Sequence, residues 1–321
     1  MPKVLYGGQS YDCPPGVSLL DGLAAHGVQI PSSCRSGVCQ NCLVRAASGE
    51  IPPAAQAGLK PALRARNYLL ACRCVPKGDI EIATREEPLP RIRAEVAAVG
   101  RLNAQIVSLR LRPAQPFEYR AGQYLRLFMD DRTSRCYSLA SVPHLDSEIE
   151  LHVKRAPQGR VSGWIHEAVR AGQVLTISEA TGESFYVPGQ PGQPLLLIGT
   201  GCGLGSLAGI VRDALHQGHT GPIRLYHGSR RADGLYRTEE LSRIAAGHPN
   251  VRFVQCVSRE TAPAGAEQGN ALQIALSETP DLTGWRVFLC GDQDMVASAR
   301  REAFLAGASM SAIHADPFMP S

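Results

Sequence analysis

Three cysteines fall within one short segment of this sequence, CRSGVCQNC, at Cys34, Cys39 and Cys42. A fourth, Cys72, follows thirty residues later, so the spacing is Cys-x4-Cys-x2-Cys and then a distant cysteine. Clustered thiols in a chain that lacks the disulfide density of a small secreted domain indicate metal or redox chemistry. The four thiols therefore predict a metal centre.

This spacing favours a [2Fe–2S] cluster held by the four cysteine thiolates. Gly37 and the neighbouring serines let backbone N–H groups approach and offset the negative charge of thiolates and sulfides. Zinc is the alternative, but zinc sites usually contain two Cys-x2-Cys pairs, and Cys72-x-Cys74 is a poor second half. Cys74 also competes with Cys72 for the place of fourth ligand.

The region around this motif, residues 1–88, resembles a plant-type ferredoxin domain. Paired strands are expected at Lys3–Tyr6 and Gln9–Cys13, and a helix is expected in VSLLDGLAAHG, which ends at Gly27. The resemblance implies a β-grasp fold. It also favours Cys72 as the fourth ligand, because the segment YLLACRC is similar to the ferredoxin ending in which the first cysteine is the ligand.

A linker is expected at residues 89–92, because the segment REEPLPRI combines charges with two prolines. Short β-rich segments separated by turn residues fill residues 93–190 and indicate an antiparallel barrel or sandwich. One helix is expected over residues 162–169.

Two segments of this region resemble the flavin motifs of the ferredoxin–NADP reductase family. RCYS, residues 135–138, matches its R-x-Y-S motif, and LHVKRAPQGRVSGW matches the segment that follows. The resemblance implies an antiparallel β-barrel that binds FAD. Arg135 would bind the pyrophosphate as a guanidinium fork, Tyr137 would lie against the isoalloxazine ring, and the Ser138 hydroxyl would lie near flavin N5. Tyr137 and Ser138 are thus expected to be catalytic.

The second segment implies further FAD contacts. Lys154 would lie near the adenosine half, and Gly159, Val161 and Ser162 would begin a helix whose free N–H groups favour the pyrophosphate. The family often has a Gly-Pro-x-Gly turn after the next strand, and this sequence retains only Gly182 of that turn.

Strands alternate with helices over residues 191–321, which predicts a parallel α/β domain with helices on both faces. The segment GTGCGLGS lacks the G-x-G-x-x-G fingerprint. It resembles the GTG turn of the same reductase family, in which Gly199, Thr200 and Gly201 would let nicotinamide and pyrophosphate approach the backbone. The family usually continues with Ala-Pro, whereas this sequence has Leu204-Gly205.

Two segments near the end of the sequence extend the resemblance. FLCGDQDMV is similar to C-G-P-P-x-M and implies that Cys290, a third catalytic residue, lies near nicotinamide C4. Asp292 and Gln293 replace the two prolines. The ending IHADPFMPS implies that Phe318 covers the flavin, with a frayed tail as the alternative.

The arginines that follow two predicted strands bear on the choice of nucleotide. NAD sites usually offer a carboxylate to the ribose, and NADP sites offer arginine. The sequence reads Ser229-Arg230 after the second predicted strand of the α/β domain and Ser258-Arg259 after the third. Ser258-Arg259 resembles the Ser-Arg pair of NADP-specific reductases, while relatives with the same domain layout usually use NADH. NADH is therefore expected, with NADPH as the alternative.

The domain order resembles that of reductase components of multicomponent bacterial oxygenases. LTGWRVFLCG and IHADPF look most similar to the naphthalene 1,2-dioxygenase reductase subgroup. The resemblance implies that electrons pass from NAD(P)H through FAD to the cluster, and then to a ferredoxin or a terminal oxygenase component. The alternatives are a reductase that supplies a deoxysugar dehydratase and a redox-sensing module without turnover.

Composition limits the remaining partners. The 321 residues carry a net charge of +4 without a basic block, so nucleic acid is not expected as a partner. The N-terminal segment has no apolar signal region, and the longest aliphatic runs are too short to cross a bilayer. A cytoplasmic monomer without membrane partners is expected.

Overall fold

The computed structural model describes residues 1–32, 35–37, 42–59, 63–64, 67–83, 91–131 and 133–318. The chain forms two compact units, Met1–Pro90 and Arg91–Ser321. Of the predicted linker, residues 89–90 lie outside the described ranges, and residues 91–92 begin the first strand of the second unit.

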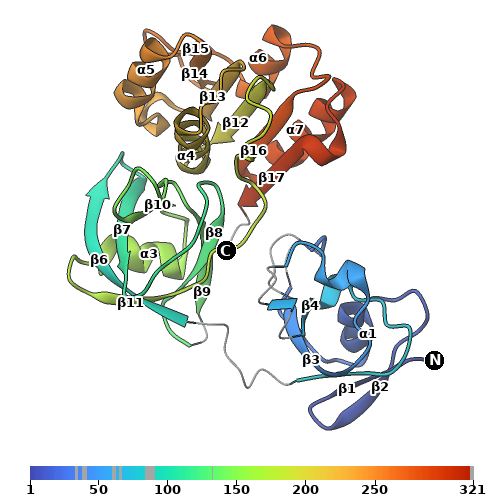
Figure 1. Ribbon diagram of the computed structural model, residues 1–321. Coiled ribbons are helices and arrows are strands. Elements are labelled where there is room, and N and C mark those ends of the chain that lie inside the picture. Colours follow the sequence, from blue (N-terminus) through green and yellow to red (C-terminus); the bar gives the residue numbers. More distant parts are fainter. Residues whose placement is uncertain are drawn as a thin grey trace. The chain divides into compact units, whose positions relative to one another are not determined.

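The first unit contains a five-stranded mixed sheet in the order β2-β1-β5-β3-β4 (Figure 1). β1 pairs antiparallel with β2 and parallel with β5, as the β-grasp prediction requires. The elements are β1 (Lys3–Tyr6), β2 (Gln9–Asp12), α1 (Leu19–Ala25), β3 (Leu43–Gly49), β4 (Tyr68–Leu70) and β5 (Ile80–Ile82), with short 3-10 turns at Pro53–Gln56 and Ala71–Arg73.

Helix α1 forms where the sequence supplies both a cap and an apolar face. The Ser18 side chain accepts a hydrogen bond from the Asp21 N–H at 3.1 Å, which satisfies one free donor of the first turn. Leu19 and Leu23 are buried in the core of the sheet. The helix ends at Ala25, just before Gly27, which has a φ of +80°.

The second unit begins with six antiparallel strands in the order β10-β7-β6-β11-β8-β9. A bridge between Leu139 and Leu151 joins the two ends of this sheet, which closes it as a barrel. Its elements are β6 (Arg91–Arg101), β7 (Ile106–Pro113), β8 (Tyr124–Phe128), β9 (Ser134–Ser138), β10 (Ile149–Lys154), α3 (Arg160–Glu167) and β11 (Val174–Ser178).

A parallel six-stranded sheet follows, in the order β15-β14-β13-β12-β16-β17 (Figure 1). Its strands are β12 (Leu195–Thr200), β13 (Ile223–Ser229), β14 (Val251–Val257), β15 (Glu267–Gln268), β16 (Arg286–Asp292) and β17 (Ile313–Phe318). Its helices are α4 (Gly203–His216), α5 (Thr238–Gly247), α6 (Ala271–Glu278) and α7 (Gln293–Leu305), with 3-10 turns at Ala232–Gly234 and Met310–Ala312.

The central strand β12 shows why helices cover both faces of this sheet. Leu195 and Leu197 pack into one core with α4 and α5, and Leu196 and Ile198 pack into a second core with α6 and α7. Side chains alternate between faces along a strand, so an unbroken aliphatic run serves both cores. The predicted fold class, with ferredoxin, antiparallel barrel and parallel α/β domains, is confirmed.

Strand order also locates the site. β13 and β16 flank β12 and their crossover connections run in opposite directions, which makes the carboxyl ends of β12 and β16 a topological switch point.

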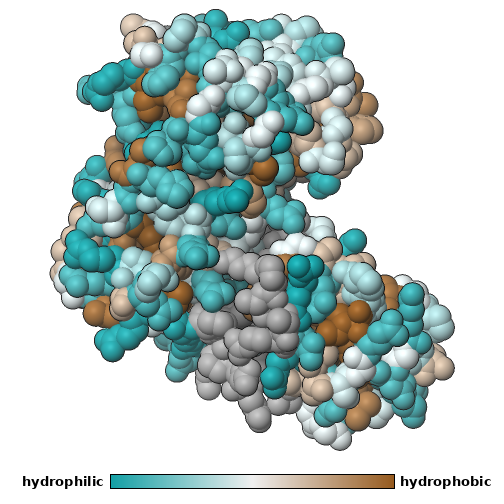
Figure 2. Space-filling view, viewed as in Figure 1, coloured by the Kyte–Doolittle hydropathy of each residue, from teal (hydrophilic) through white to brown (hydrophobic). Residues whose placement is uncertain are grey.

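Hydrophilic side chains cover much of the face seen in Figure 2. No helix within the described ranges is both long and apolar enough to cross a membrane.

Candidate active site

The first unit brings two of the four predicted cluster cysteines together. Cys42 Sγ lies 3.3 Å from Cys72 Sγ. Tetrahedral bonds of about 2.3 Å to one metal atom hold two sulfurs about 3.8 Å apart, so a shared metal atom fits this pair with little movement. The other two predicted ligands, Cys34 and Cys39, lie outside the described residues.

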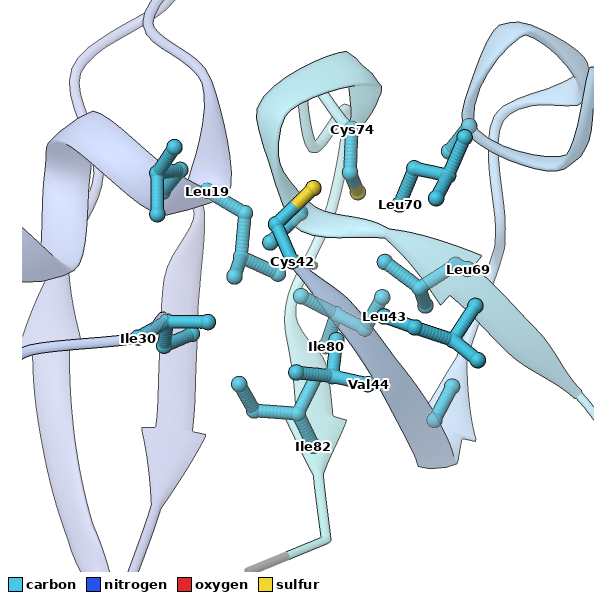
Figure 3. Close-up of a cluster of buried hydrophobic side chains, with 14 of the residues drawn as sticks. Leu19, Ile30, Cys42, Leu43, Val44, Leu69, Leu70, Cys74, Ile80 and Ile82 are labelled. Atoms are coloured by element: carbon cyan, nitrogen blue, oxygen red, sulfur yellow. The ribbon is translucent and has the colours of Figure 1, made fainter. Parts of the chain in front are cut away.

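Cys74, the alternative fourth ligand, is enclosed in the hydrophobic core (Figure 3). Burial, with a smaller effect of the neighbouring Cys13, raises the pKa of its thiol to about 12. Cys72 Sγ contacts Cys42 Sγ, whereas Cys74 packs among the side chains of the core. The geometry therefore favours Cys72, and this donor set fits a [2Fe–2S] cluster.

In the second unit, two backbone turns meet at the switch point beside β12. Gly199, Thr200 and Gly201 form the first turn, in which Gly201 has a φ of +54°. The second turn is the end of β16. A Cβ on Gly203 would lie only 2.5 Å from the Cys290 carbonyl oxygen, so this close approach requires glycine.

Three polar side chains gather between these turns and the barrel. Ser138 Oγ, at the end of β9, donates a 2.6 Å hydrogen bond to Asp316 Oδ2 in β17. Cys290 Sγ donates to the same oxygen at 3.8 Å and lies 3.1 Å from Ser206 Oγ. Burial raises the pKa of both the Asp316 carboxyl and the Cys290 thiol. Cys290 is therefore a neutral hydrogen-bond donor rather than a thiolate.

Asp316 is a site residue that no sequence motif indicated. It stands within IHADPF, a segment that drew attention only for its phenylalanine. Its partner Ser138 is 178 residues away along the chain, and β17 brings the two together by pairing with β16. A carboxylate two residues before a candidate aromatic is the signal that could have revealed it.

The predicted flavin residues of β9 and β10 surround the same place. Tyr137 is half-buried against the barrel core, and burial raises the pKa of its phenol. Arg135 is exposed, and its Nη1 donates to the Ser134 carbonyl at 3.0 Å. Lys154 faces the glycine turn, where a Cβ on Gly201 would lie 3.8 Å from Lys154 Nζ.

The N-terminus of α3 borders a polar cavity of about 240 Å³. Gly159 begins the helix without a side-chain cap, and Arg160 lines the cavity. Ser162 Oγ accepts from the Ala156 N–H at 3.1 Å, while Val161 packs into the barrel core. Free helix N–H groups beside an arginine suit an anion such as a pyrophosphate, so the residues fit FAD.

Two further predicted residues occupy ordered positions. Gly182, after β11, has a φ of +102°, and a Cβ there would lie 3.0 Å from the Tyr124 ring. Phe318, in β17, pairs with Asp292 of β16. Its ring packs half-buried against the core of the parallel α/β domain, which is the nucleotide-binding domain of the sequence prediction. The alternative of a frayed tail therefore does not hold for Phe318.

The two Ser-Arg pairs lie side by side at the ends of β13 and β14. The Ser258 N–H donates to the Ser229 carbonyl at 3.1 Å, and the Arg259 N–H donates to the Arg230 carbonyl at 3.0 Å. Neither guanidinium has a carboxylate partner in the part of the chain that the structure describes. Both arginines are thus available to a phosphate or ribose.

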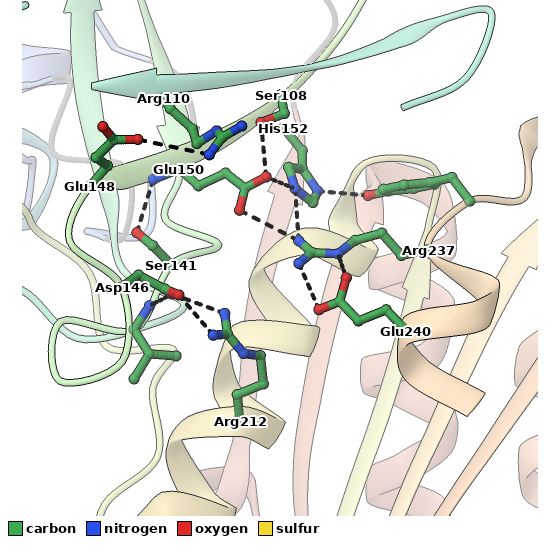
Figure 4. Close-up of polar contacts among 12 residues, drawn as sticks. Ser108, Arg110, Ser141, Asp146, Glu148, Glu150, His152, Arg212, Arg237 and Glu240 are labelled. Atoms are coloured by element: carbon green, nitrogen blue, oxygen red, sulfur yellow. Dashed lines mark hydrogen bonds and ion pairs between the residues drawn. The ribbon is translucent and has the colours of Figure 1, made fainter. Parts of the chain in front are cut away.

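Polar contacts also join the barrel to the nucleotide-binding domain (Figure 4). Arg237, just before α5, places Nη1 3.1 Å from His152 Nε2 and 3.7 Å from Glu150 Oε2, both on β10. Arg212 of α4 makes a bidentate pair with Asp146 of the barrel at 2.8 and 2.9 Å. Charge-assisted contacts of this kind fix the two domains against each other.

Known families cover the chain in three consecutive blocks. A 2Fe-2S iron-sulfur cluster binding domain matches residues 4–77, an oxidoreductase FAD-binding domain matches residues 95–186, and an oxidoreductase NAD-binding domain matches residues 197–301. Fold, site and matches define an iron–sulfur flavoprotein oxidoreductase that uses a nicotinamide nucleotide.

The chain is similar to reductases over nearly its whole length. It is 34% identical to the naphthalene 1,2-dioxygenase system ferredoxin–NAD(P)+ reductase component of Pseudomonas putida, across 95% of this chain and 94% of the relative. It is 34% identical to the aromatic O-demethylase reductase subunit of an Amycolatopsis species, across 99% and 98%. The crystal structure of Amycolatopsis cytochrome P450 reductase GcoB matches with a TM-score of 0.72 and 32% identity, across 100% and 99%.

A more distant relative has a different role. The CDP-6-deoxy-L-threo-D-glycero-4-hexulose-3-dehydrase reductase of Yersinia pseudotuberculosis is 28% identical, across 95% of this chain and 94% of the relative. The chain belongs to the family of ferredoxin–NAD(P)+ reductase components. The predicted family and the predicted cofactors, a [2Fe–2S] cluster, FAD and a nicotinamide nucleotide, are confirmed.

Proposed function

We propose that this reductase takes electrons from NAD(P)H and delivers them to a ferredoxin or a terminal component of a multicomponent oxygenase. The observation that carries the proposal is the Ser138–Asp316–Cys290 cluster, which the barrel and the nucleotide-binding domain build jointly at the switch point. Such a junction brings a nucleotide and a flavin face to face. When bound, FAD takes up a hydride as two electrons and releases them one at a time to the cluster.

The residues around the junction bind and orient these groups. Arg135 and the first N–H groups of α3 would hold the FAD pyrophosphate, and the Tyr137 ring would lie along the isoalloxazine. Lys154 faces the glycine turn, which supports a contact with a nucleotide phosphate, and its contact with the adenosine half of FAD stays a prediction. Gly182 keeps the backbone close beside the Tyr124 ring.

At the reacting end, backbone and side chains have separate tasks. Gly199, Thr200 and Gly201 admit the nicotinamide to the backbone, while Ser138 and Asp316 orient it through their hydrogen bond. Phe318, at the end of β17, would cover the flavin and exclude water when no nucleotide is bound. In the first unit Cys34, Cys39, Cys42 and Cys72 hold the cluster.

NADH is proposed as the main donor, with NADPH also accepted. Arg230 and Arg259 are available for a 2′-phosphate, and Ser229 and Ser258 stand beside them. The Glu260 carboxylate accepts a hydrogen bond from the Ala232 N–H, and Glu260 and Asp233 both pair with Arg231, so two carboxylates lie at the same edge. A carboxylate near the ribose favours NADH, and unpaired arginines keep NADPH acceptable.

A second acceptor is favoured by one relative, the dehydrase reductase. A deoxysugar dehydratase would accept electrons from the same cluster. Comparing turnover with a purified dehydratase and with a purified oxygenase component therefore separates the two acceptors.

We further propose that the protein is a cytoplasmic monomer. A mass measurement on the protein as it elutes from a size-exclusion column tests the monomer. A redox-sensing module without turnover would show no NAD(P)H oxidation with cytochrome c as acceptor.

The experiment that tests the function is an anaerobic titration of the holoprotein with NADH and then NADPH. Absorbance follows the flavin, and EPR at the endpoint follows the [2Fe–2S] centre. Flavin bleaching with a reduced-cluster signal supports the reductase. A flavin that stays oxidised with both nucleotides would overturn it.

A further inference from the structure

A hydrogen-bonded column runs beneath the glycine turn of the nucleotide-binding domain. Tyr236 Oη lies 3.0 Å from His152 Nδ1 and donates to the Cys202 carbonyl oxygen at 3.4 Å. His227 Nε2 donates to the Gly201 carbonyl oxygen at 3.2 Å. Two successive carbonyls of the turn are therefore supported from below.

Aromatic contacts make the three supporting side chains one packed group. The Tyr236 ring meets His152 at 5.4 Å and His227 at 5.5 Å between centroids, both edge-on. All three residues are buried. Burial lowers the pKa of both histidines, that of His227 to about 4, so both rings are neutral at physiological pH.

The two ring nitrogens of His152 connect the column to charged groups of both domains. Nδ1 lies 3.0 Å from Tyr236 Oη, whose hydroxyl also contacts the Cys202 carbonyl oxygen. Nε2 lies 3.2 Å from Glu150 Oε1 and 3.1 Å from Arg237 Nη1. The contacts thus lead from Arg237 through His152 of the barrel and Tyr236 to the Cys202 carbonyl of the turn.

Gly205 explains how His152 reaches this place. A Cβ on Gly205 would lie 2.7 Å from His152 Cγ, so any larger residue displaces the imidazole. Only glycine at this position leaves room under the turn for a side chain of the barrel.

We propose that His152, Tyr236 and His227 are positioning residues that fix the Gly199–Gly203 turn to the flavin barrel. Since His152 belongs to β10 and the other two belong to the nucleotide-binding domain, the barrel itself sets the height of the turn above Tyr137 and Ser138. The column thereby sets the distance between nicotinamide and flavin. This inference rests on the proposed reductase function.

The first test compares Tyr236→Phe with Tyr226→Phe in the full-length holoprotein. Tyr226 is a matched control, because it is a buried tyrosine of the same domain whose hydroxyl bonds Glu278 at 2.7 Å and which packs in a different core from Tyr236. Tyr236→Phe is expected to slow flavin reduction by saturating NADH about tenfold while changing the Kd of NAD+ less than about twofold. Tyr226→Phe is expected to leave the rate near that of the wild type.

A second readout does not depend on activity. Amide hydrogen exchange of the peptide that contains residues 199–205 is expected to speed up in Tyr236→Phe and to stay unchanged in Tyr226→Phe. Equal exchange in the two variants, or equal reduction rates, would overturn the proposal. If neither nucleotide reduces the flavin of the wild-type protein, the proposed function fails. The exchange comparison would then still show whether the Tyr236 hydroxyl stabilises the turn.

The third variant pair tests the contact between Gly205 and His152. Gly205→Ala is expected to slow flavin reduction because it displaces the imidazole. Adding His152→Ala to Gly205→Ala removes that clash, so the double variant is expected to match His152→Ala alone. Rates that fall multiplicatively in the double variant would show that the two residues act independently and would contradict the proposal.

Discussion

Cysteine serves the two units in opposite ways. In the first unit Cys42 and Cys72 place their sulfurs 3.3 Å apart, where a metal atom can bind both. In the second unit Cys290 stands alone in β16 between a serine hydroxyl and a carboxylate, and burial keeps its thiol protonated. The same side chain is thus a ligand where thiolates meet and a hydrogen-bond donor where it is enclosed.

The difference lies in the surroundings rather than in the residue. Cys74 is only two residues from Cys72, yet it packs among aliphatic side chains of the core. Cys72 follows β4 at a turn and is partly exposed. A shift of two residues therefore separates the predicted fourth ligand from a core residue, and substitutions can test that separation.

The largest effect is expected for Cys72→Ala. Loss of a direct ligand should lower cluster affinity by more than the roughly 10- to 100-fold that is lost when a residue hydrogen-bonded to a ligand is changed. The EPR signal and cytochrome c reduction should be lost, while NADH still bleaches the flavin. A Cys72→Ala protein that retains a full [2Fe–2S] signal would exclude Cys72 as the fourth ligand.

Cys290→Ala should have the next largest effect. Removal of the thiol takes one donor from Asp316 and leaves space beside the nicotinamide position, so the limiting rate of flavin reduction should fall about tenfold. Cys290→Ser, which keeps a donor, should recover part of the rate. The matched control is Cys256→Ala, a buried cysteine on β14, which should leave the rate unchanged. Equal rates for Cys290→Ala and Cys256→Ala would remove Cys290 from the site.

A smaller effect, on stability alone, is expected for Cys74→Ala. The cavity left by the sulfur should lower the free energy of unfolding of the first unit by about 1–2 kcal/mol. Denaturation followed by visible absorbance of the cluster measures this change. The cluster-to-flavin ratio should equal that of the wild type, and a lost cluster would show that Cys74 is a ligand.

The smallest effect concerns pH. The folded state holds the Cys74 pKa near 12, well above the ordinary value of 9.0, so its thiol stabilises the fold below pH 9 and loses that contribution as pH rises toward 12. The destabilisation caused by Cys74→Ala should therefore shrink by about 1.4 kcal/mol per pH unit in this range. Paired denaturant titrations at pH 8 and pH 10 measure it. A constant difference would mean that Cys74 titrates normally.

Sequence spacing revealed the parts of the site that are local. Three of the four cysteines, the R-x-Y-S motif and the GTG turn each occupy a short segment whose residue types predict the bound group. The alternation of strands and helices after residue 191 likewise follows from local patterns, and it matched the parallel sheet.

Residues that meet only in the folded chain could not be found in this way. Ser138 and Asp316 are 178 residues apart, and Arg237 and His152 are 85 apart. The sequence marked Gly205 as a departure from a family pattern but did not show the imidazole that fills the space. Such partners depend on how the barrel and the parallel sheet pack, which no short motif encodes.

The sheet of the first unit has a consequence for the order of its folding. β1 lies between β2 and β5, so its Val4 pairs with Ile80 from the far end of the unit, and the Lys3 N–H bonds Asp79 across 76 residues. Pairings between such distant segments form slowly, because the loop between them must close first. During synthesis the ribosome must release the strand that follows Cys72 before the central strands can join.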